Sequence, residues 1–208
     1  VDEQNRLVCQ RTGYVLNPYP SNREPPTLID SNLGEGTARR FIRGTLGEWR
    51  GSALPPEIEE ALASGAVIHA LCRQHRLGIL DSNLGVIIGF RAGIGYRTEI
   101  SAGFTGSPYD THRQWFLYGG TGGVYRMIDL ENWSLLSLGG VGGVARCYAN
   151  GTQIGQDFNA GTSFSSEGIW VGFNLNGDIA QIGIEPVSSL EDMDAKALHA
   201  AQECRLAP

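Results

Sequence analysis

The residues between positions 107 and 115 combine aromatic rings with charged and polar side chains. Carbohydrate recognition uses flat aromatic rings for the apolar faces of sugars and polar groups of fixed direction for the hydroxyls. We therefore predict that this loop binds a ligand through Tyr109, Asp110, His112, Arg113 and Trp115. The alternative is an ordinary turn whose two aromatic residues anchor it to the core.

Asn and Asp residues gather in two turns of the C-terminal part. Asp157 lies in one turn, and Asn174, Asn176 and Asp178 lie in the other. If the two turns met at one rim of the domain, their side-chain oxygens would suit a hard cation. This arrangement predicts a calcium site formed by these four residues. Because Asn and Asp are also the commonest turn residues, turn formation alone is the alternative.

Catalytic signatures are missing from the sequence. A glucanase of the sandwich type places two carboxylates on one strand, but the chain contains no E-x-D-x-E run. It also lacks a G-x-S-x-G elbow, a cysteine-protease signature and a phosphate loop. The acidic group Glu57, Glu59 and Glu60 falls in a predicted helix and is typical of a solvated face. We therefore assign no catalytic residue.

The charge and hydropathy of the chain limit its partners. The net charge of -6 and the isoelectric point near 5.2 argue against binding to nucleic acid, which requires clustered basic residues. No stretch approaches the roughly 18 consecutive apolar residues that span a bilayer, so we expect no membrane insertion. A length of 208 residues fits one all-β domain.

The four cysteines, Cys9, Cys72, Cys147 and Cys204, are widely spaced and form no zinc-ligand pattern. An even, dispersed set predicts two disulfides and hence an oxidising compartment. The start at Val1 rather than Met is typical of a processed terminus. We therefore expect an extracellular, cell-surface or virion location, with four buried free thiols as the alternative.

Glycine accounts for 29 residues, and the glycines separate short segments that are typical of strands. The predicted strands cover residues 84–90, 114–118, 124–130, 133–138, 144–148 and 169–174. Asn150-Gly151 and Asn176-Gly177 each predict a type I′ hairpin. Two similar glycine-rich stretches, 119–124 and 139–144, predict similar turns.

Two segments are predicted to be helical. Residues 55–64 begin with two prolines and acidic residues and end before a glycine, as helix termini prefer. Residues 189–204 begin with a capping box at Ser189 and Asp192. Their apolar residues recur every three or four positions, so we expect this helix to pack on the sandwich, with Met193 in the packing face.

Residues 133–206 carry an ordered series of motifs: WSLL at 133, CYANG at 147, IWVGFN at 169 and GDIAQI at 177, followed by the capped helix. This series resembles the closing half of a concanavalin A-like or laminin G-like jelly-roll domain. The resemblance implies an antiparallel β-sandwich. Double-glycine patterns also occur in β-prism lectins, so that fold is the structural alternative, and residues 1–70 match no family pattern.

Three functions remain open, because the sandwich fold hosts many. The first is a non-catalytic recognition module that binds a glycan or a cell-surface protein through loops at the sandwich edge. The second is a polysaccharide-degrading hydrolase or lyase. The third is a structural subunit of a fibre or virion shell, for which stable oligomers are expected.

Overall fold

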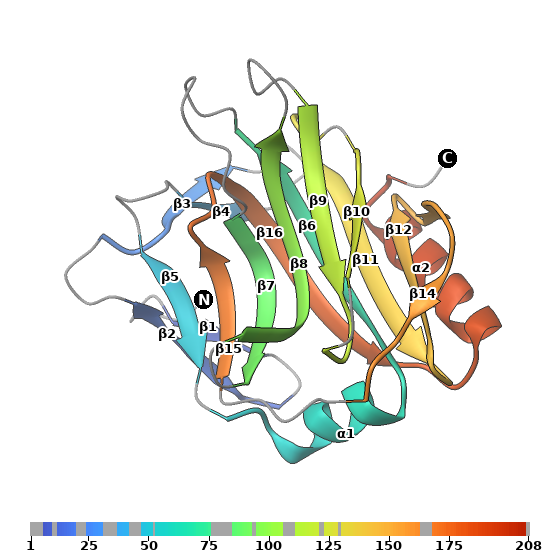
Figure 1. Cartoon of the computed structure of the whole chain (residues 1–208). Coiled ribbons are helices and arrows are strands. Elements are labelled where there is room, and N and C mark those ends of the chain that lie inside the picture. The colour runs from blue at the N-terminus through green and yellow to red at the C-terminus, as the bar shows by residue number, and fades with distance from the viewer. Residues whose placement is uncertain are drawn as a thin grey trace.

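The computed structural model describes residues 6–9, 12–19, 24–30, 37–41, 47–51, 53–75, 85–92, 95–105, 111–120, 123–128, 130–162 and 168–206. Its strands form two antiparallel sheets that pack face to face, accompanied by two helices (Figure 1). The predicted antiparallel sandwich with two helices is confirmed, and the β-prism alternative, which requires a third sheet, is wrong. Neither helix among the described residues has the length and apolar character needed to cross a membrane.

The sheet that faces the viewer in Figure 1 is called the front sheet here. Its strands, in spatial order, are β1 (Leu7–Val8), β2 (Val15–Tyr19), β5 (Glu48–Gly51), β15 (Gly168–Phe173), β7 (Gly85–Ala92), β8 (Gly95–Thr105), β9 (Thr111–Leu117) and β10 (Val124–Arg126).

The other sheet is called the back sheet. Its strands, in spatial order, are β13 (Thr152–Gln153), β12 (Val144–Ala149), β11 (Ser134–Val141), β6 (Ala66–Gln74), β16 (Gly177–Pro186), β4 (Thr37–Phe41) and β3 (Thr27–Asp30), and β14 (Phe158–Asn159) also pairs with β12.

Strand β6 is the middle of the back sheet, and sequence patterning did not predict it. Its residues from Ala66 to Cys72 are all buried. Ile68 and Ala70 face the core between the sheets, whereas Val67 and Leu71 pack against the C-terminal helix. A strand that is covered on both faces has a continuous apolar run instead of the period-two alternation that marks a half-exposed strand.

Both predicted helices are confirmed, at nearly the predicted bounds. Helix α1 (Pro56–Ser64) begins after Pro55 and ends at Gly65. Helix α2 (Leu190–Glu203) begins at Ser189, whose hydroxyl accepts a hydrogen bond from the backbone N–H of Asp192. The side chain of Met193 is fully buried between α2 and the back sheet, as its packing role predicted.

The two Asn-Gly dipeptides have different outcomes. Asn150 and Gly151 have φ of 51° and 80° and join β12 to β13, which confirms the first hairpin. Asn176-Gly177 does not form the second hairpin, because β15 lies in the front sheet and β16 in the back sheet. The chain crosses between the sheets here, and the side-chain amide of Asn176 donates to the carbonyl of His75 instead.

The predicted disulfides do not form, and all four cysteines are free thiols. Cys72 lies opposite Ser134, and Cys147 lies opposite Leu138. These two positions on β11 are four residues or about 13 Å apart, far beyond the Cα separation of about 7 Å that a disulfide can bridge. Burial raises the pKa of both the Cys72 and Cys147 thiols to about 12, so they stay protonated.

Near the end of β11, Gly140 packs so closely against the Tyr118 ring that there is no room for a side chain. Strand β11 continues through Gly140, and the turn forms at Gly142 and Gly143, whose φ values are 60° and 83°. A Cβ atom at Gly140 would lie 2.5 Å from the Tyr118 ring. That ring is held in place, since its hydroxyl donates to the carbonyl of Leu62 and accepts from the N–H of Ala66.

We predict that Gly140→Ala destabilises the domain by about 1–3 kcal/mol, because the Tyr118 ring cannot move aside without breaking two buried hydrogen bonds. Gly183→Ala, also within a strand of the back sheet, is the matched control. Its new methyl group would come no closer than 3.8 Å to His69, so its effect should be near zero or slightly stabilising. Urea unfolding of the two variants measures the difference, and equal stabilities would contradict the steric argument.

Candidate functional site

Neither helix of the described residues packs on the outer surface of the front sheet. The main contacts of α1 and α2 are with strands of the back sheet. Figure 1 shows α2 at the right of the molecule and α1 at the lower end of the sandwich. Every second side chain of each strand in a sheet points to the same face. These side chains are therefore presented on one broad surface.

Strand pairing identifies which side chains point outward. Trp170 lies opposite Arg50 on one side and opposite Gly89 on the other. The neighbours of Trp170 in sequence, Ile169 and Val171, are buried in the core, so Trp170 and Arg50 face outward. The same reasoning extends across the sheet and defines what we call the aromatic face: Tyr19, Glu48, Arg50, Arg91, Glu99, Ser101, Trp115, Tyr125, Trp170 and Phe173.

The Arg50 guanidinium is stacked between two aromatic rings. Its Cζ atom lies 3.5 Å from the ring centroid of Tyr19 and 3.4 Å from that of Trp170. Its Nε–H also donates to Glu48 Oε1 at 2.7 Å. Cation–π contacts of this kind contribute about 0.5–2 kcal/mol each. The contacts therefore hold side chains of β2, β5 and β15 in one fixed arrangement.

The neighbouring strand adds a second cation to Trp170. The Cζ atom of Arg91, on β7, lies 4.8 Å from the Trp170 ring centroid. Phe173 packs edge-on against Trp170 with 4.7 Å between centroids. Strict alternation along β15 would turn Phe173 inward, but Gly172 has a φ of 76° and reverses the alternation there. Only glycine adopts this conformation freely, and a Cβ at Gly172 would collide with Phe41.

Glu99 lies two strands from Trp170, and Gly89 between them has no side chain. The Glu99 side chain accepts a hydrogen bond from the hydroxyl of Ser101. Burial raises the pKa of Glu99 to about 7, so a substantial fraction of this group is protonated at neutral pH. A protonated carboxyl both donates and accepts hydrogen bonds, which suits the hydroxyl groups of a polar ligand.

Trp115 and Tyr125 extend the face towards the edge strand β10. Their ring centroids are 4.3 Å apart, and Tyr125 is 43% exposed. Of the predicted ligand-binding residues, Trp115 thus lies on the aromatic face. The backbones of His112 and Arg113 belong to β9, whereas their side chains, together with all of Tyr109 and Asp110, lie outside the described residues. The loop site therefore stays a prediction.

The four residues of the predicted calcium site do not come together. Asp157 pairs with Arg146 at 2.9 Å, and Asp178 pairs with Arg73 at 2.7 Å. Along the back sheet, Arg146 is level with Val67 of β6, six residues or about 20 Å from Arg73. Asn174, at the end of β15, and Asn176 lie near Asp178 in the chain, far from Asp157. In the described part of the chain, no cluster of three or more His, Cys, Asp and Glu residues could hold a metal ion.

Asp178 instead forms a buried ion cluster that sequence analysis missed. Its side chain has no exposed surface, and its carboxylate accepts hydrogen bonds from Arg40, Arg73 and His75. Burial alone would raise the pKa of Asp178, but these hydrogen bonds outweigh burial and hold the pKa well below its usual range. The one carboxylate is fully engaged by these three partners, so the cluster joins strands and offers a ligand no unpaired acid.

The aromatic face shows no pair of carboxylates at a catalytic spacing among its described side chains. Glu48 on β5 and Glu99 on β8 are three strands or about 14 Å apart. Glycoside hydrolysis by two carboxyl groups requires a separation of about 5–9.5 Å. The arrangement is therefore suited to stacking and hydrogen bonding.

No protein-family model and no curated protein matches the chain. Its fold is similar to that of the botulinum neurotoxin serotype G binding domain, with a TM-score of 0.62 and 10% identity over 93% of this chain and 47% of that one. It is also similar to the binding domain of botulinum neurotoxin DC in complex with rat synaptotagmin II, with a TM-score of 0.61 and 12% identity over 96% and 51% of the two chains.

A third similar structure, from work on the interaction of botulinum neurotoxin type C with two ganglioside molecules, has a TM-score of 0.61 and 11% identity over 97% and 52%. The chain thus spans about half the length of the structures it matches. At these identities the likeness establishes a shared β-sandwich fold.

We predict that Glu99→Gln changes the pH dependence of stability. The pKa of Glu99 is raised from 4.5 to about 7 in the folded protein, so the folded state binds the proton more tightly than the unfolded state. The stabilisation that this tighter proton binding gives the folded state is complete below pH ~4.5 and is lost as the pH rises to about 7. The free energy of unfolding of Glu99→Gln should therefore gain up to about 3 kcal/mol relative to wild type across this range.

Urea unfolding of both proteins at several pH values measures this difference. The comparison at pH ~4 is the internal control, since residue 99 is then largely uncharged in both proteins. A difference that does not vary with pH would show that Glu99 ionises normally.

Proposed function

We propose that this protein is a non-catalytic recognition module of the concanavalin A-like jelly-roll kind that binds carbohydrate through the aromatic face of its front sheet. The similar structures support the proposal, because they are described as binding domains. One was solved with SialylT, another with rat synaptotagmin II, and a third concerns interaction with gangliosides. The partner proposed here is correspondingly a glycan, free or carried by a cell-surface protein.

The observation that carries this proposal is the set of fixed aromatic rings on the outer surface of the front sheet, away from both described helices. Trp170 and Trp115 each lie in ring contacts that limit their motion. A ring that is already held loses little side-chain entropy on binding, which otherwise costs about 0.5–1.5 kcal/mol per side chain. Arg91 and Glu99 stand beside these rings as groups able to hydrogen-bond the sugar hydroxyls.

We propose that the predicted edge loop belongs to the same binding surface. Strand β9 begins at Thr111, directly after Asp110, and carries Trp115 onto the aromatic face. We propose that the loop residues Tyr109 and Asp110 extend the glycan-binding surface at the end of β9. Binding to glycans would place the protein outside the cell, on a cell surface or on a virion, where such ligands are displayed.

We predict that Trp170→Ala weakens glycan binding at least about tenfold, because it removes both a stacking surface and the ring that orients Arg50. Trp133→Ala is the matched control, since Trp133 also has an arginine, Arg73, stacked over its ring at 4.8 Å but directly precedes β11 of the back sheet. A glycan array identifies the ligand, and calorimetry then gives the affinity of each variant.

The array is read with calcium and with a chelator, and every bound glycan is analysed for cleavage products. Binding without calcium and without products agrees with the proposal. Equal loss of affinity in Trp170→Ala and Trp133→Ala would move the site away from the aromatic face. Absence of binding to any glycan would refute the carbohydrate role, and released sugars would show that the protein is an enzyme.

A further inference from the structure

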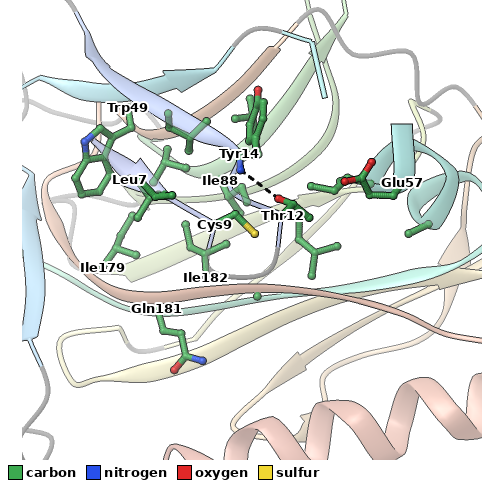
Figure 2. Close-up of a pocket in the computed structure, with 18 of the residues that line it drawn as sticks. Leu7, Cys9, Thr12, Tyr14, Trp49, Glu57, Ile88, Ile179, Gln181 and Ile182 are labelled. Carbon is green, nitrogen blue, oxygen red and sulfur yellow. Dashed lines mark hydrogen bonds between the residues drawn. The ribbon is translucent and has the colours of Figure 1, made fainter. Parts of the chain in front are cut away.

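A cavity of about 1110 Å³ opens between the two sheets along β16, on the side away from the aromatic face. Figure 2 shows Leu7 and Trp49 of the front sheet facing Ile179 and Ile182 of β16, and Glu57 of α1 at the far end. Gln181, which is exposed, points away from the cavity. Nothing in the proposed glycan site uses this space.

Strand pairing explains why the cavity is open. In the described part of the chain, only the first residues of β16, Gly177, Asp178 and Ile179, pair with β4. From Ala180 to Pro186, the described pairing of β16 is with β6 alone. The opposite edge of this segment therefore borders the cavity, whose other lining residues come from β1, β2, β5, β7, β15 and α1, among other segments. The space follows the chain from Ile179 on β16 to Val187 just after its end, eight residues or about 26 Å.

The walls of the cavity are mainly apolar. Side chains from both sheets and from α1 contribute, among them Leu16, Trp49, Ile58, Ile88, Ile182 and Ile184. Ile182 and Ile184 are only partly buried, although they pack against the main core. Apolar side chains that border open space gain free energy when an apolar ligand displaces the water. The long shape fits an extended hydrocarbon chain.

At one end of the cavity, the guanidinium of Arg39 has an N–H group that makes no hydrogen bond. Arg39, on β4, lies opposite Ile179 and Leu28 and lines the cavity. Its Nη1 donates to the carbonyl of Pro26, but its Nε is buried and has no hydrogen-bond partner. A buried N–H without an acceptor is unfavourable, and a carboxylate is the acceptor that a guanidinium binds most strongly.

The opposite end has the opposite charge. Glu57 and Glu60 of α1 line the cavity there and are exposed. An anionic group would be repelled at that end and attracted at Arg39. The charges therefore set one orientation for an amphiphile, with its anionic head at β4 and its tail directed towards α1.

We propose that this cavity binds a long-chain carboxylate, with the hydrocarbon tail lying along β16 and the carboxylate accepting the Nε–H of Arg39. The site is independent of the aromatic face, so glycan binding and fatty-acid binding can succeed or fail separately.

The test is a fluorescence titration of the full chain with cis-parinaric acid at a pH where the acid is ionised, followed by displacement with hexadecanoate. The methyl ester of the probe, which has the same tail and no charge, is titrated in parallel. Wild type should bind the acid saturably at one site and more tightly than the ester.

Arg39→Gln should weaken binding of the acid about tenfold and leave the ester unchanged, because only the charged hydrogen bond is lost. Arg205→Gln, at an exposed arginine beyond α2, is the charge-matched control and should bind like wild type. Ile182→Trp should abolish binding of both ligands by filling the cavity, provided that its thermal unfolding remains cooperative.

Three results would overturn the proposal: no saturable binding of the acid, equal affinity of wild type for acid and ester, or an equal effect of Arg39→Gln on both. If Ile182→Trp does not fold, the comparison of acid and ester in Arg39→Gln still decides between these outcomes.

Discussion

The arrangement of the two sheets depends on the buried carboxylate of Asp178. Within one residue of the start of β16, it binds Arg40 of β4 and Arg73 of β6, on either side, and His75 just beyond β6. A buried charge is tolerated only when its partners are in place, and the loss of one partner costs about 3–5 kcal/mol. The cluster therefore fixes the start of β16, immediately after the chain has crossed from the front sheet. The pairing of β16 with β6 that starts here continues to Pro186, with one register shift between Ile179 and Gln181.

The crossing explains how the two candidate sites arise from consecutive strands. Strand β15 presents Trp170 on the outer surface of the front sheet, whereas β16 presents Ile179 and Ile182 to the space between the sheets. A hairpin at Asn176-Gly177 would have put both strands in one sheet and removed this separation. Because β4 ends its pairing with β16 at Ile179, the rest of the β16 edge borders the cavity. The ion cluster therefore anchors the start of β16, whereas the edge of its later residues that faces away from β6 borders the cavity.

Local patterns in the sequence predicted the elements whose signals are local. Both helices were found from their capping residues, and β12 and its hairpin were found from Asn150-Gly151. Strand β6 was missed because burial on both faces removes its alternation, and the ion cluster was missed because Arg40 and Asp178 are 138 positions apart. Trp170 could have been recognised as outward-facing from the alternation of Ile169 and Val171, but Phe173 could not. Its direction depends on the positive φ of Gly172, which the sequence shows only as one glycine among 29.

The aromatic face is rigid because the strands that carry its side chains are fixed by their inward-facing residues, which pack in the core. Arg50 lies between the rings of Tyr19 and Trp170. Trp49, next to Arg50 in sequence, and Val171, next to Trp170, are buried in the core. The inward residues fix the strand positions, and the strand positions then bring the outward rings into contact. A ligand that stacks on this face meets side chains whose ordering has already been achieved during folding. The same packing that stabilises the sandwich therefore reduces the entropy lost on binding, and this connects the fold to the recognition function that we propose.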